Sequence, residues 1–162
     1  MAEQNNANTQ PRRMEDDILE LFNGELKETA LKFAADLTAN RLTPKQWRPK
    51  CWKIPHNECH LCMIQLEPNK WKLTFFFGDY SGKFDEGFIK AVQENVRTCT
   101  SCHDPCTGGI DTMIFGKECL NACSQLTIQF ENPNAETLGH IKQLLEYSKK
   151  VPPQSESWHA HH

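Results

Sequence analysis

The sequence predicts an α+β fold: a small antiparallel sheet with flanking helices and a structural zinc knuckle. Three observations point to it. Apolar residues recur at helical spacing in several stretches of the chain. Residues 70–77 alternate apolar and polar side chains, which is the pattern of a half-buried strand. Five of the eight cysteines lie between Cys99 and Cys123, at spacings typical of a structural metal site.

The chain length predicts one domain with two tails. A chain of 162 residues falls within the roughly 100–200 residues expected of a single domain. Residues 1–13 are rich in Asn and Gln and are predicted to be a disordered leader. Residues 14–150 are predicted to form the α+β domain with its zinc site, and residues 151–162 a flexible His-containing tail.

Composition favours a cytoplasmic protein with reduced thiols. No run of 18 apolar residues is present to cross a membrane, and residues 1–13 lack the apolar core of a signal peptide. Closely spaced cysteines in a reducing compartment more often bind metal than form disulfides, although eight cysteines would also suit four bridges.

Two helices are predicted near the start of the chain, over Met14–Phe22 and Glu25–Asn40, separated by the turn-forming pair Asn23-Gly24. The second has an apolar stripe composed of Leu26, Ala30, Phe33 and Leu37. Three strands are predicted to follow, over Cys51–Ile54, Cys59–Leu66 and Lys70–Phe77. The last two are close enough in sequence to form an antiparallel hairpin.

The second half is predicted to begin with a central helix, Asp85–Thr98, which leads directly to Cys99. Strands are predicted over Asp111–Phe115 and Ser124–Phe130. A last helix is expected to begin with Asn132 as its cap and Pro133 at its first position. Its apolar stripe consists of Leu138, Ile141, Leu144 and Leu145.

The central cysteines predict one structural Zn²⁺ per chain. Cys99, Cys102 and Cys106 have the two-to-four-residue spacing that directs thiolates at one tetrahedral ion. Cys123 is the preferred fourth ligand, because it is expected to begin a strand beside the knuckle. Cys119 remains the alternative ligand, but it could equally fill an apolar slot, as a free cysteine often does. Within the knuckle, His103 and Asp104 could donate hydrogen bonds to the sulfurs or lie exposed in a loop.

A second pair, Cys59-x-x-Cys62, leaves two interpretations open. In a strand, positions three apart point to opposite faces, so these sulfurs would not share a metal. Cys62 would then lie in the core, with Cys59 more exposed. If the strand began after Cys62, His56 and His60 could complete a second metal site.

Catalysis is not favoured by any motif. A redox role for Cys99 and Cys102 is disfavoured, because a thiolate at the end of the predicted helix would be opposed by the helix dipole. The chain contains no glycine-rich phosphate loop, no nucleophile elbow and no His-Glu-x-x-His motif. The protein is therefore expected not to be an enzyme, unless it has a site that these motifs do not describe.

Residues 42–147 contain a series of short motifs: Trp52-Lys53-Ile54, Cys62-Met63-Ile64, Trp71, Gly78-Asp79-Tyr80, Asn95-Val96, Cys99, Cys102, Cys106, Ile114-Phe115-Gly116-Lys117-Glu118, Cys123 and Phe130-Glu131-Asn132-Pro133. In these motifs the chain resembles a family of small bacterial cysteine-rich domains of unknown function. In that family the position of Cys119 is usually aromatic, so the resemblance implies Cys123 as the fourth ligand. The position of His103 is often glycine there. The resemblance implies no reaction.

These observations favour a zinc-stabilised binding or sensor domain for an unknown small molecule or protein. Five aromatic residues could line its pocket, although such residues more often simply belong to the core: Trp47, Trp52, Trp71, Phe75 and Tyr80. The alternative is a single-stranded nucleic-acid-binding module. Residues 41–72 hold seven basic residues against two acidic ones, and their tryptophans could stack on bases. The net charge of −3 and seven acidic residues in 15–36 disfavour that alternative.

Overall fold

The computed structural model describes residues 11–99 and 108–153. Within these residues the chain forms four α-helices, a five-stranded antiparallel sheet and a two-stranded antiparallel sheet. This confirms the predicted α+β class. The zinc knuckle was predicted across residues 99–123, and its members Cys102 and Cys106 lie outside the described residues.

The main sheet has the strand order β1-β2-β3-β4-β7. Its strands are β1 Lys45–Arg48, β2 Cys51–His56, β3 Cys59–Glu67, β4 Lys70–Phe75 and β7 Ile128–Glu131. The predicted β3–β4 hairpin is present, with Glu67 opposite Lys70 and Cys62 opposite Phe75. Strand β1 was not predicted, because its sequence Lys-Gln-Trp-Arg has no strand-like apolar alternation.

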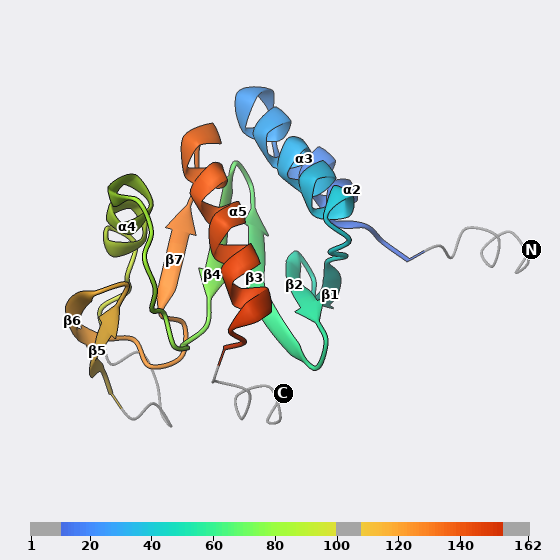
Figure 1. Cartoon of the computed structure of the whole chain (residues 1–162). Helices are drawn as coiled ribbons and strands as arrows, with labels where there is room; N and C mark the ends of the chain where they lie inside the picture. The colour runs from blue at the N-terminus through green and yellow to red at the C-terminus, as the bar shows by residue number, and fades with distance from the viewer. Residues whose placement is uncertain (1–10, 100–107, 154–162) are drawn as a thin grey trace, which may run out of the picture.

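Helices cover one face of this sheet (Figure 1). They are α2 Met14–Leu21, α3 Gly24–Ala39 and α5 Ala135–Lys150. The predicted stripes face the core: Ala30, Phe33 and Leu37 of α3 are at most 2% exposed, as are Ile141, Leu144 and Leu145 of α5. From the sheet, Trp52, Trp71, Leu73 and Phe75 complete the core and are also at most 2% exposed. Each large apolar side chain buried in this way contributes roughly 1.5–3 kcal/mol.

The predicted cap of α5 was wrong by two residues. Asn134 caps the helix, and its side chain accepts a hydrogen bond from the Thr137 amide at 2.8 Å. Asn132 instead has φ +45° and accepts a hydrogen bond from the Trp71 amide at 2.8 Å. The local sequence allows either Asn132 or Asn134 to cap the helix. The hydrogen bond from Trp71 of β4 engages Asn132, so Asn134 is the cap.

The central helix was predicted too long. Helix α4 spans Glu86–Gln93 and begins as expected, with the Asp85 side chain capping the Phe88 amide at 2.8 Å. Beyond it the chain is extended along β7, where Gln129 N donates to Asn95 O at 2.9 Å and Arg97 N to Thr127 O at 2.8 Å. Cys99 is thus not at a helix end, and the dipole argument against a redox role no longer applies.

The two-stranded sheet pairs β5 Ile110–Ile114 with β6 Lys117–Ala122, and we call this hairpin the ribbon. Strand β5 matches the predicted Asp111–Phe115, but β6 was not predicted. The expected strand Ser124–Phe130 begins only at Ile128. One face of the ribbon joins the main core through Ile114, Phe115, Cys119 and Ala122. Its other face exposes Met113 and Leu120, by 58% and 64%.

Candidate metal centre and ligand cleft

Two of the predicted zinc ligands, Cys99 and Cys123, lie on neighbouring antiparallel segments. Thr98 and Ala122 form a β-bridge, flanked by hydrogen bonds from Cys99 N to Asn121 O at 2.8 Å and from Cys123 N to Arg97 O at 2.7 Å. This register sets Cys99 and Cys123 at diagonal positions on the same face, because side chains alternate along extended segments. Diagonal neighbours of this kind have Cβ atoms roughly 7 Å apart or slightly less.

The backbone around this pair is tightly packed. A Cβ added to Gly109 would lie 2.8 Å from Cys99 Cβ and 2.0 Å from Asn121 Oδ1, so only glycine fits there. The hydroxyl of Ser124, the residue after Cys123, donates to Gly108 O at 3.3 Å. The described chain therefore leaves this spot at Cys99 and returns to it at Gly108.

Cys99 and Cys123 are the two predicted ligands that the structure describes, and their placement is compatible with a thiolate zinc site. Zn–S bonds of about 2.3 Å allow one ion to span two diagonal cysteines on a sheet face. Cys102, His103, Asp104 and Cys106 lie outside the described residues. Among the residues that are described, no group of three or more His, Cys, Asp or Glu side chains could hold a metal ion.

Cys119, the alternative ligand, faces the core. Its side chain is buried, and the thiol donates to Gln93 Oε1 at 3.2 Å. Burial raises the pKa of Cys119, which disfavours the thiolate that zinc requires. Cys99 and Cys123 are only partly buried.

The pair Cys59 and Cys62 lies within β3, so the strand does not begin after Cys62 as a second metal site would require. Cys62 is fully buried, as expected, and its burial raises the pKa of the thiol well above the ordinary value. The expected exposure of Cys59 was wrong. It is 7% exposed, because it packs into the main core and its thiol donates to His56 O at 3.4 Å.

Of the two roles considered for the aromatic residues, four of the five have the core role. Trp52, Trp71, Phe75 and Tyr80 are at most 4% exposed and belong to the main core, because they lie beneath the helices. Trp47 alone is on the opposite face of the sheet. There the guanidinium carbon of Arg48 and the Nζ atom of Lys53 lie 3.9 and 3.8 Å from its ring centroid.

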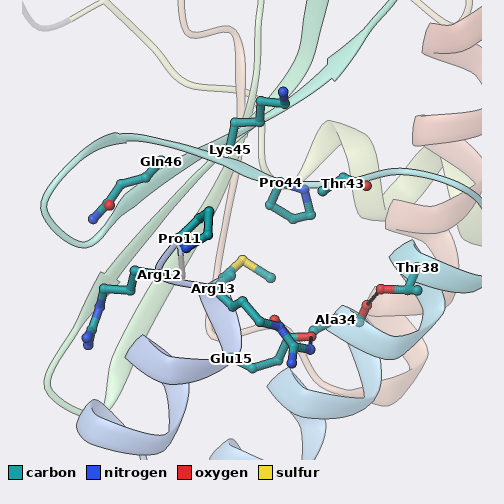
Figure 2. A pocket seen from close by; sticks show the side chains of 11 residues that line it. Pro11, Arg12, Arg13, Glu15, Ala34, Thr38, Thr43, Pro44, Lys45 and Gln46 are labelled. Atoms are coloured by element: carbon teal, nitrogen blue, oxygen red, sulfur yellow. Dashed lines mark hydrogen bonds and ion pairs between the residues drawn. The ribbon is translucent and has the colours of Figure 1, made fainter. Parts of the chain in front are cut away.

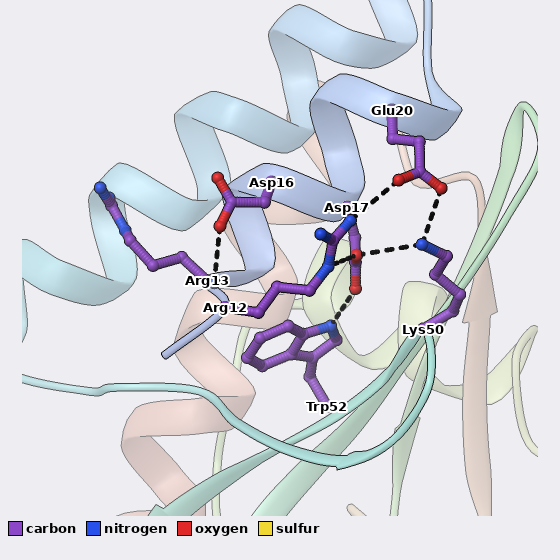
Figure 3. Close-up of polar contacts among 7 residues, drawn as sticks. All are labelled: Arg12, Arg13, Asp16, Asp17, Glu20, Lys50 and Trp52. Carbon is purple, nitrogen blue, oxygen red and sulfur yellow. Dashed lines mark hydrogen bonds and ion pairs between the residues drawn. The ribbon is translucent and has the colours of Figure 1, made fainter. Parts of the chain in front are cut away.

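A buried carboxylate ties α2 to the sheet (Figure 3). Asp17 is fully buried and accepts hydrogen bonds from Trp52 Nε1 at 2.8 Å, Arg12 Nε at 2.5 Å and Lys50 Nζ at 3.3 Å. Burial by itself would raise the pKa of Asp17. The hydrogen bonds from these three partners outweigh it and hold the pKa below its ordinary value. Glu20, which pairs with Arg12 and Lys50, completes what we call the Asp17 cluster.

A cleft of about 680 Å³ opens beside this cluster (Figure 2). Three separate segments form it: the residues before and at the start of α2, the last turns of α3, and the approach to β1. The side chains around it are Pro11, Arg12, Arg13, Met14, Glu15, Ala34, Thr38, Thr43, Pro44, Lys45 and Gln46. Sequence analysis did not identify this cleft, since no spacing motif links residues so far apart.

Comparison with protein-family models, curated proteins and solved structures finds no match to this chain. Membership of the cysteine-rich family therefore stays a prediction. No helix within the described ranges combines the length and apolar character needed to cross a bilayer.

Proposed function

We propose that the protein is a non-enzymatic binding domain stabilised by one Zn²⁺ held by Cys99, Cys102, Cys106 and Cys123. The observation that carries this proposal is the shared face of Cys99 and Cys123 on paired segments. In sequence, Cys102 follows Cys99 by three residues and Cys106 precedes Gly108 by two. An extended chain rises at most about 3.5 Å per residue, and these short separations in sequence are compatible with four thiols reaching one ion.

Zinc would stabilise the ribbon rather than replace the core of the whole domain. The main sheet already buries its own aromatic core beneath three helices. Zinc binding to a four-thiolate site supplies on the order of 10 kcal/mol in small zinc domains. Here the ion would join residues 99–123, the part of the chain that includes the ribbon and its exposed outer face.

The nucleic-acid alternative is less well supported by the arrangement of its residues. Trp52 and Trp71 are buried and unable to stack on bases, and Lys53 is only 4% exposed. Lys50 and Lys70 form ion pairs with Glu20 and Glu131. Stacking on bases in this region would depend on Trp47, which is already in contact with Arg48 and Lys53.

Metal analysis with native mass spectrometry tests the proposal. The chain carries His159, His161 and His162 at its end, so these are first replaced by Ala to remove a competing ligand. We expect one zinc per chain. Cys123→Ser should abolish zinc retention, whereas Cys119→Ser, the matched control four residues earlier, in β6, should retain it.

Two results would contradict the proposal in different ways. Absence of zinc from the chain that keeps all eight cysteines would refute the metal site itself. Zinc lost in Cys119→Ser but kept in Cys123→Ser would refute only the choice of the fourth ligand.

A further inference from the structure

The cleft beside α2 has the size of a small-molecule site. Its volume of about 680 Å³ lies within the roughly 300–1,000 Å³ typical of such sites. It is lined by segments that are distant in the chain, from Pro11 to Gln46. The function proposed above requires a ligand. Of the aromatic residues first considered, four lie in the core, and Trp47 lines a smaller hollow of about 430 Å³ on the opposite face of the sheet.

The interior of the cleft is mainly apolar. Met14 and Ala34 line it and are only 2% and 3% exposed. The rings of Pro11 and Pro44 also line it (Figure 2). The hydroxyl of Thr38 is engaged, because it donates to Ala34 O at 3.3 Å. Such a lining favours a flat apolar body over a sugar or another strongly hydrated molecule.

The rim of the cleft carries surplus positive charge. Its lining includes three basic side chains, Arg12, Arg13 and Lys45, against the single carboxylate of Glu15. Arg13 pairs with Glu15 at 2.9 Å, and Arg12 pairs with acids outside the cleft. Lys45 is exposed and has no ion-pair partner among the described side chains. Its flexible stem allows the ammonium to reach a single anionic group at the rim.

One wall of the cleft is held in place before any ligand arrives. Arg12, which lies between the wall residues Pro11 and Arg13, is anchored to Asp17 and Glu20 of the Asp17 cluster (Figure 3). Asp17 is fully buried and also holds Trp52, so this anchor reaches into the core. A preformed wall reduces the ordering cost of binding.

We propose that this cleft is the ligand site of the domain and takes a small organic anion with a flat apolar body, such as an aromatic carboxylate or sulfonate. This assignment rests on the binding function proposed above, and it adds the class of ligand. It does not depend on the metal, because the cleft and the cysteine pair share no residue.

Two fluorescent probes test both parts of the ligand class in the full-length chain. One is 1-anilinonaphthalene-8-sulfonate, and the other is N-phenyl-1-naphthylamine, which has a similar aromatic body and no charge. We expect one saturable site for the sulfonate, at least about fivefold tighter than for the neutral probe at low salt. Equal affinity for the two probes would overturn the anionic assignment.

Substitutions locate the site. Thr38 is exposed at the rim, so Thr38→Trp should fill the cleft without disturbing the core and weaken sulfonate binding by at least about tenfold. Ala35→Trp adds the same ring at an exposed position of the same helix outside the cleft lining, and should leave binding unchanged. Lys45→Gln should weaken binding of the sulfonate but not of the neutral probe.

Unchanged sulfonate binding in Thr38→Trp, or equal loss in Ala35→Trp, would show that the probe binds elsewhere and would overturn the proposal. Zinc content is measured in every variant. A chain without zinc that still binds the sulfonate through Thr38 and Lys45 would refute the metal site and leave the cleft standing. A chain that holds zinc but fails the probe test would refute the cleft as the ligand site and leave the proposed metal site unaffected.

Discussion

The helix-covered sheet and the ribbon are stabilised by different means. The main sheet buries large side chains on its helix-covered face, including Trp52, Trp71 and Phe75, beneath three helices. The ribbon has two strands, buries side chains on one face only and exposes Met113 and Leu120 on the other. An isolated two-stranded hairpin is at best marginally stable in water. The ribbon therefore depends on its attachments to the rest of the domain, among them a backbone pairing and a buried aromatic ring.

The first attachment is the backbone pairing of residues 97–99 with 121–123, where the zinc ligands Cys99 and Cys123 are proposed. The second is Phe115 at the tip of the ribbon. Its ring packs within an aromatic group with centroid separations of 4.9–5.8 Å, formed by Tyr80, Phe84, Phe88 and Tyr147. Phe115 has φ +47°, an unusual conformation for so bulky a residue. Burial of the ring offsets the unfavourable backbone conformation of Phe115.

The largest effect is expected from the main sheet. Trp71 is fully buried against Phe22 and Phe33, so Trp71→Ala leaves a large cavity and should lower the free energy of unfolding by roughly 3–5 kcal/mol. Chemical denaturation monitored by circular dichroism measures this. If Trp71→Ala lowers the free energy of unfolding by less than about 1 kcal/mol, the main sheet does not depend on its aromatic core, and the contrast with the ribbon is wrong.

A smaller and local effect is expected at the tip of the ribbon. Phe115→Ala removes a ring that is 3% exposed and should speed amide exchange across β5 and β6, while amides of β3 and β4 keep their protection. Phe115→Gly also removes the ring but relieves the left-handed backbone, and should be more stable than Phe115→Ala by about 1 kcal/mol. Hydrogen exchange measured by NMR separates the regions. Equal loss of protection in both sheets would show that they open together.

The smallest effect is expected at the Asp17 cluster and depends on pH. Because the folded state lowers the pKa of Asp17, its charge stabilises the protein above the unfolded-state value near 4, and this stability is lost as the pH falls through the lower folded-state value. Asp17→Asn should therefore lower stability by roughly 1–2 kcal/mol at pH 7 and flatten the acid side of the stability profile.

Thermal melts between pH 7 and pH 2 measure this effect, with Glu25→Gln on the exposed start of α3 as the control. An unchanged acid profile in Asp17→Asn would contradict a role for Asp17 charge in holding α2 to the main sheet.

Much of the main sheet and its helices could be predicted from sequence. The stripes of α3 and α5 and the alternation of β4 lie on faces that the structure buries. The predictions failed where a tertiary hydrogen bond overrides a local preference. Residues 94–98 carry a helix-compatible pattern, yet the helix ends in a turn at residues 94–95 and pairing with the chain before and within β7 extends the residues from Val96 onward. The polar strand β1 has no sequence signal, and it forms because β2 offers an edge with which it can pair.

In the candidate sites, too, some features could be predicted from local sequence and others depend on tertiary contacts. The spacing of Cys99, Cys102 and Cys106 indicates metal chemistry by itself, because tight turns bring near neighbours to one ion. Spacing does not choose between Cys119 and Cys123, because residues four apart in a regular strand would share a face. The left-handed backbone of Asn121 (φ +56°) and the register shift between β5 and β6 interrupt the alternation. Cys119 is therefore in the core, while Cys123 lies on the segment that pairs with residues 97–99. The cleft has no sequence signal, since Met14, Ala34 and Pro44 meet only after the helices have docked on the sheet.

By itself the sequence determined the α+β class, the helical stripes, the β3–β4 hairpin and the presence of a thiol cluster, because each depends on residues close together in the chain. Only the tertiary structure decided which segments pair and which aromatic residues are buried, and it alone placed Cys99 and Cys123 on a shared face. These outcomes depend on contacts between residues far apart in the chain, and such contacts become favourable only when the core that they share has formed.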